Sequence, residues 1–128
     1  MNVGLVIAGS LCFVLAAGHA LVGRAVLDSL PRNLEATRFG GGAFTRGMLL
    51  FTWHALSLWL TTSGAVLVAL ARGEPADYRG PVVFLVGAAY AAATVVLAWG
   101  SRRRPSDLLR IPVWVLFIVI IGLCWLNG

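Results

Sequence analysis

Charged residues are scarce in this chain and are absent from four long stretches of it. Of the 128 residues only 12% are Asp, Glu, Lys or Arg, whereas 59% are hydrophobic. In a soluble domain about a quarter of all residues are charged. The charge-free stretches are 1–23, 47–71, 80–101 and 111–128. This distribution excludes a soluble enzyme, a disordered chain and a secreted fold held together by disulfides.

Each charge-free stretch has about the length that a helix needs to cross the hydrocarbon core, roughly 20 residues. We therefore predict an all-α membrane protein, a four-transmembrane-helix bundle that forms a single integral membrane domain over residues 1–128. The expected spans are about 2–23, 47–71, 81–100 and 109–127. The longest connection, about 24–45, is expected to be an interfacial cytoplasmic loop with a short helix beginning near Pro31.

Cysteine is also scarce, since the chain has only Cys12 and Cys124. They lie in the first and last apolar stretches and form no CxxC motif. Thiol oxidoreductases that depend on a paired redox motif are therefore excluded. We expect both thiols to be buried and inert.

Lysine is absent, so all ten basic residues are arginines. This fits a GC-rich bacterial genome and points to the cell (inner) membrane. Eight arginines fall in the first and third connections and two in the second. Cytoplasmic loops carry the excess of basic residues, so the multi-pass chain is expected to have its N- and C-termini outside. The net charge of +5 is explained by this topology and by anionic lipid, and we expect no nucleic acid partner.

Small residues recur in the first and third predicted spans. Such stripes let helix backbones approach closely where no hydrophobic effect drives helices together. We expect these two spans to be tightly packed, and the uniformly bulky fourth span to face lipid. The small residues are Gly4, Ala8, Cys12, Ala16 and Ala20 in the first span and Gly87, Ala88, Ala91 and Ala92 in the third.

Two histidines, His19 and His54, lie inside predicted spans that contain no Asp, Glu, Lys or Arg. Counting from the arginines at the same boundary, a rise of about 1.5 Å per residue places both at a similar depth. Ser57 and Thr61 follow His54 at helical spacing, so one polar stripe is expected to face protein. The candidate polar intramembrane site is thus His19, His54, Ser57 and Thr61.

Three interpretations of the histidines remain open. Each imidazole could hydrogen-bond a neighbouring helix and hold the helices in register. His19 and His54 could instead ligate a metal or a haem, although two histidines alone leave a zinc or copper site incomplete. A proton-responsive pair is the third possibility, because histidine titrates near neutrality. The first interpretation needs no cofactor.

No carboxylate lies in a span to orient a nucleophile or a base, so we do not expect an enzyme. The sequence predicts a non-enzymatic membrane protein that acts by helix association, as a homo-oligomer or as an accessory subunit of a membrane complex. Its partners would be the lipid bilayer and itself or another membrane protein. The alternative is a transporter, a channel or a haem- or metal-binding protein that uses the two histidines.

The predicted topology is tested by labelling single cysteines in intact cells with a reagent that does not cross the membrane. Asn2→Cys and Asn127→Cys should react from outside, because both termini are expected there, whereas Arg103→Cys in the third connection should not. Labelling of Arg103→Cys from outside would contradict the topology.

Overall fold

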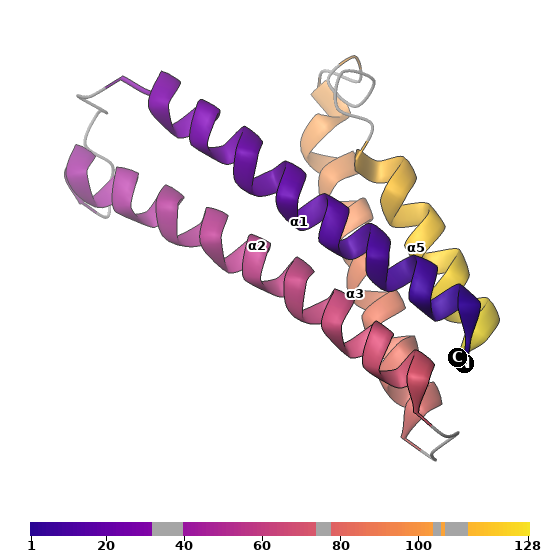
Figure 1. Cartoon of the computed structure of the whole chain (residues 1–128). Helices are drawn as coiled ribbons and strands as arrows, with labels where there is room; N and C mark the ends of the chain where they lie inside the picture. Colours follow the sequence, from indigo (N-terminus) through magenta and orange to yellow (C-terminus); the bar gives the residue numbers. More distant parts are fainter. Residues whose placement is uncertain (32–39, 74–77, 104–105, 107–112) are drawn as a thin grey trace. The chain divides into compact units, whose positions relative to one another are not determined.

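Helices make up almost all of the part of the chain that the structure describes. The computed structural model describes residues 1–31, 40–73, 78–103, 106 and 113–128. These form the helices α1 (Val3–Ser29), α2 (Gly42–Arg72), α3 (Arg79–Gly100) and α5 (Val113–Asn127), with a short 3-10 turn, η1 (Ser101–Arg103), as Figure 1 shows. No strand occurs among these residues, so the predicted all-α class is confirmed.

Three of the helices are long and apolar enough to cross a membrane. The mean hydropathy of their most apolar segments is 2.2 for α1, 1.5 for α2 and 2.2 for α3. Helix α5 is equally apolar in character but has only 15 residues. The predicted fourth span also included 109–112, which lie outside the described residues.

The helices on either side of the predicted first connection extend into it. Helix α1 continues past Arg24 as far as Ser29, and α2 already begins at Gly42. The first arginine therefore does not end the helix. A long side chain such as arginine can leave the apolar region while its backbone stays helical. The helix ends just before Pro31 instead, because the residue preceding a proline disfavours helical geometry.

The short helix predicted to begin near Pro31 falls mostly on residues 32–39, which lie outside the described residues. The helix ends on either side of this segment are tied to each other. The Arg46 guanidinium donates to the Leu27 carbonyl at 3.3 Å, and Ser29 Oγ donates to the Val26 carbonyl at 2.7 Å. Both bonds reach carbonyls in the last turn of α1, where a helix runs out of backbone donors, and the Leu27 carbonyl also accepts the Leu30 N–H at 3.4 Å.

The chain divides into two compact units, one of Met1–Cys12 with Ser63–Gly128 and the other of Phe13–Thr62. The first unit contains the start of α1, the end of α2 and all of α3 and α5. Helix α3 packs on α5, and Gly87 makes room there for the Trp125 indole and Cys124. The buried side chains of this unit include Leu5, Ala8, Cys12, Leu67, Ala71, Val83, Tyr90, Phe117, Ile120 and Cys124.

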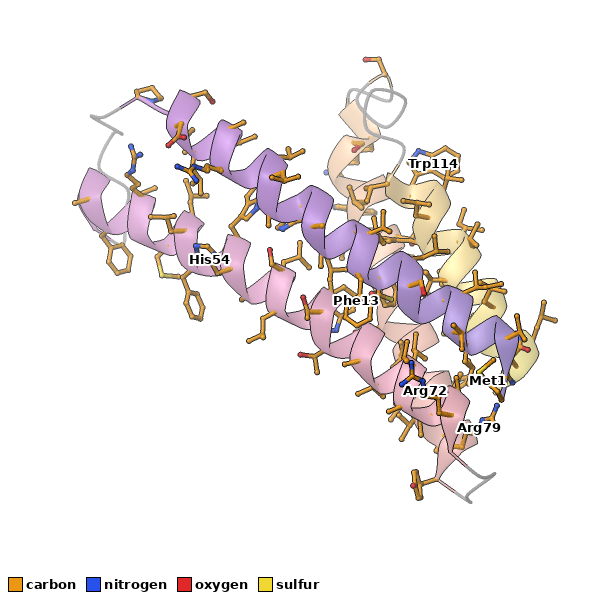
Figure 2. All side chains as sticks on the ribbon, viewed as in Figure 1. Met1, Phe13, His54, Arg72, Arg79 and Trp114 are labelled. Atoms are coloured by element: carbon orange, nitrogen blue, oxygen red, sulfur yellow. The ribbon has the colours of Figure 1, made fainter. Side chains whose placement is uncertain are left out.

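Both chain termini, the end of α2 and the start of α3 lie at one end of the first unit. The Asn2 backbone N–H donates to the Ala71 carbonyl at 2.9 Å, and Asn2 Nδ2 donates to the Asn127 carbonyl at 3.2 Å. Figure 2 shows Met1, Arg72 and Arg79 at this same end. The predicted topology requires this arrangement, because it places the termini and the second connection on one side.

The second unit is the helical hairpin formed by the rest of α1 and α2. Its buried side chains include Leu15, Ala16, Leu27 and Leu60. The two helices run antiparallel (Figure 1), and the Arg46–Leu27 bond holds their ends next to the first connection.

The small-residue stripe of α1 is buried only in its central part. Ala8, Cys12 and Ala16 are buried, but Gly4 is half-buried and Ala20 is exposed. The reason is geometrical: a strict four-residue spacing advances about 40° per step around a helix of 3.6 residues per turn. The stripe therefore rotates away from the contact at both ends.

The third and fourth predicted spans differ from expectation in a similar way. In α3 Gly87 is buried, whereas Ala88 and Ala91 are half-buried and Ala92 is exposed. Helix α5 was expected to face lipid all round, but one side of it is buried through Phe117, Ile120 and Cys124. Bulky residues on every side of a helix do not reveal which side packs.

Two glycines of α1 provide a matched test of close helix packing. At Gly9 an added Cβ would lie 2.7 Å from Val68 Cγ2 and 2.8 Å from the Gly64 carbonyl oxygen, whereas nothing lies within 4 Å at Gly18. Gly9→Ala should lower the free energy of unfolding by about 1–3 kcal/mol, while Gly18→Ala should be neutral or stabilising by up to about 1 kcal/mol. Thermal unfolding in detergent measures both. Equal effects of the two substitutions would contradict the close approach at Gly9.

Candidate functional site

His19 is bonded to Ser57 inside the α1–α2 hairpin. His19 Nδ1 lies 3.0 Å from Ser57 Oγ, and the Ser57 hydroxyl donates to the Trp53 carbonyl at 3.2 Å. A serine hydroxyl has a single proton, so when Ser57 donates to the Trp53 carbonyl its Oγ accepts from His19 Nδ1–H. In that tautomer His19 Nε2 carries the free lone pair.

Trp53 fixes the orientation of the imidazole. Its indole ring stacks on the His19 ring with centroids 4.3 Å apart and planes 15° apart. The indole Nε1–H donates to the His19 backbone carbonyl at 2.9 Å. One aromatic side chain of α2 thus holds both the ring and the backbone of His19. The contact needs Gly23, because a Cβ there would overlap the Trp53 indole.

The structure does not bring His54 and Thr61 into this site. Both side chains are exposed, whereas Ser57 and Trp53 are half-buried and Leu60 is buried. His54 (labelled in Figure 2) directly follows Trp53, so it lies at the level of His19, but on another side of α2. Within the described residues, His54 and Thr61 therefore do not share the side of α2 that faces α1.

The predicted polar stripe differs from the observed one because it is counted from His54. The inward side of α2 in this unit follows Arg46, Trp53, Ser57 and Leu60, at intervals of seven, four and three. His54 lies about 100° around the axis from Trp53, since each residue of a helix advances by that angle. A stripe counted from His54 therefore included Ser57, which does face α1, together with two side chains that do not.

His54 differs from the exposed hydroxyl residues around it. Thr61 Oγ1 donates to the Ser57 carbonyl at 2.9 Å, and Thr52 Oγ1 donates to the Met48 carbonyl at 2.8 Å. Hydroxyls can bond the preceding turn of their own helix in this way, whereas the His54 imidazole makes no such bond. Within the described residues His54 makes no hydrogen bond or ring contact.

A second polar contact, which the sequence analysis missed, lies in the other unit. Tyr90 on α3 is fully buried, and its hydroxyl donates to Cys12 Sγ on α1 at 3.1 Å. Ser63 on α2 also bonds the Tyr90 side chain, and Cys124 on α5 is near enough to interact electrostatically with it. Phe117 meets the Tyr90 ring edge to face, with centroids 5.2 Å apart.

This buried polar cluster (Cys12, Ser63, Tyr90 and Cys124) takes one residue from each of the four helices. The cysteines are buried as expected, but their position beside a tyrosine was not foreseen. A signal was available in the sequence, because Tyr90 lies in the middle of an apolar stretch. A buried tyrosine hydroxyl almost always has a hydrogen-bond partner.

The arrangement of donor atoms bears on the metal and haem interpretation. In the tautomer with its proton on Nδ1, His19 has a free lone pair on Nε2 while Ser57 bonds the other nitrogen, which is how a ligating histidine is usually held. His54 is at the same level on a different side of its helix, so the two rings of one chain do not converge. No group of three or more His, Cys, Asp or Glu that could hold a metal ion is found in the described part of the chain.

The described chain is thus all-helical, with three helices long and apolar enough to cross a membrane and with polar side chains bonded from helix to helix. Comparison with protein-family models, with curated proteins and with solved structures finds no match.

The His19–Ser57 bond predicts an energetic coupling that His19 and His54 should not show. His19→Phe keeps a ring for Trp53 to stack on but removes Nδ1, and Ser57→Ala removes its partner. The double variant should be less destabilised than the sum of the singles by about 0.5–1 kcal/mol. His19→Phe and His54→Ala should be additive. Unfolding free energies in detergent test this, and coupling between the two histidines would contradict the described geometry.

Proposed function

We propose that this chain is an integral membrane protein that acts by helix association, as a homo-oligomer or as an accessory subunit of a membrane complex. The observation that carries the proposal is His54. Its imidazole is exposed on α2 and has no partner within the described residues. Arg46 at one boundary and a run of apolar residues on either side place it within the predicted span.

An exposed imidazole inside a membrane is unfavourable, because lipid tails offer no hydrogen bonds. The cost is removed when another helix covers the ring and bonds it. Thr52 and Thr61, which are also exposed on α2, do not require this, since each bonds a carbonyl of its own helix. His54 therefore supports a function in which α2 meets a helix from outside the chain.

The exposed side of α3 provides a contrast. Phe84, Leu85, Val95 and Val96 are all more than half exposed. Such a surface is satisfied by lipid tails alone. The difference between the two helices supports association through α2 and contact with lipid through α3.

Cofactor binding is the second candidate, favoured by one observation. Ser57 bonds His19 Nδ1, so Nε2 is the nitrogen without a hydrogen bond in a stacked, oriented imidazole, and in the Nδ1–H tautomer its lone pair could ligate. A haem or a metal ion bound there would need its other ligands from outside this hairpin. An optical spectrum of the purified protein tests this candidate, since bound haem gives an intense Soret band.

Removal of the His54 imidazole should weaken association and leave the fold intact. We expect His54→Leu to cost about 1–2 kcal/mol of association free energy, equivalent to roughly tenfold weaker binding. Native mass spectrometry of the protein released from membranes measures the complexes. The thermal stability of the single chain should not fall, because His54 makes no hydrogen bond or ring contact with any described residue.

Thr52→Val is the matched control for that experiment. Thr52 is also exposed on α2, but its hydroxyl bonds the Met48 carbonyl, so its removal should not change association. If the unaltered protein yields single chains and no complexes, the proposed function is overturned. Equal losses for the two variants would show that His54 has no special part in it.

A further inference from the structure

An exposed row of side chains follows one side of α2 within the hairpin unit. It consists of Gly47, Phe51, His54, Leu58 and Thr61, and we call it the outer seam. The intervals of four, three, four and three residues are those of a heptad, the repeat by which two helices meet along their length. From Gly47 to Thr61 the helix rises by 14 residues, or about 21 Å. This is much of the thickness of a hydrocarbon core, which is about 30 Å.

The outer seam offers both bulk and space to a partner helix. Phe51 and Leu58 are each 68% exposed. At Gly47 nothing lies within 4 Å of an added Cβ, so a second backbone can approach there. Small residues at such a position favour helix packing in lipid. His54 lies between the two large side chains and supplies the polar group of the seam.

We infer that the helix covering the outer seam is α2 of a second copy of this chain, in a parallel two-fold arrangement. The inference rests on the proposed function and names its partner. Two copies with the same orientation in the membrane have each residue at the same depth. A two-fold interface brings the same surface of both copies together, so His54 of one copy meets His54 of the other.

Hydrogen-bond chemistry makes this pairing self-complementary. A neutral imidazole has one donor nitrogen and one acceptor nitrogen, so two of them form an N–H···N bond between the copies. The outer seam contains no charged residue, and the pairing brings no like charges together. An unrelated partner would need a polar group of its own at the depth of His54, whereas a second copy necessarily has one.

Disulfide cross-linking in membranes tests this inference with the full chain. Leu58→Cys places a thiol on the outer seam, and Leu56→Cys places one at nearly the same level on the opposite side of α2. Leu56 is also exposed, at 38%. With copper phenanthroline as the oxidant, Leu58→Cys should give a product of two chains in several-fold higher yield than Leu56→Cys. The unaltered protein gives the background, because Cys12 and Cys124 are buried.

The possible outcomes distinguish a failure of the two-fold pairing from a failure of the proposed function. Equal yields from the two variants, or a preference for Leu56→Cys, would overturn the two-fold pairing. Native mass spectrometry on the same membranes should show two copies. One copy bound to a different protein would overturn the inference and leave the proposed function standing, while single chains alone would overturn both.

Discussion

The organising constraint of this molecule is that a polar group on an apolar helix must find its hydrogen-bond partner in protein, since lipid provides none. The polar side chains that meet this constraint within the described residues do so in two ways. Hydroxyl groups such as those of Ser10, Thr52 and Thr94 bond a carbonyl one turn earlier in their own helix. Groups with longer reach bond a different helix, as Tyr90 and Trp53 do.

The bonds between helices coincide with places where small residues allow close approach. Gly23 accommodates the Trp53 indole, which stacks on His19 and bonds its carbonyl. Tyr90 reaches Cys12, a small side chain in the buried stripe of α1. Dispersion between closely packed helices and hydrogen bonds between them are the two forces available without a hydrophobic effect. In both units the same short contacts provide the two forces together.

The two histidines show how differently one residue type can be used at one level of a helix pair. His19 is held by a hydroxyl at one nitrogen and by an indole against its face. His54 is exposed and has neither contact within the described residues. The first ring therefore belongs to the internal packing of the chain, and the second is the basis for proposing an external helix.

The pattern of apolar and charged residues is enough to predict that the chain is helical, where α2 ends and α3 runs to within a few residues, and that both histidines lie at one level. Apolar run length and the constant rise of a helix are sufficient for this. It did not determine the end of α1 beyond Arg24, because a charge at a helix end is tolerated when its side chain reaches water. Nor did it determine which side of α2 faces α1. Which side of α2 faces α1 depends on tertiary packing, because each residue turns a helix by about 100° and the neighbouring side chains set the rotation. Here Trp53 packs against His19 and Gly23, and this contact turns Ser57 inward and leaves His54 outside.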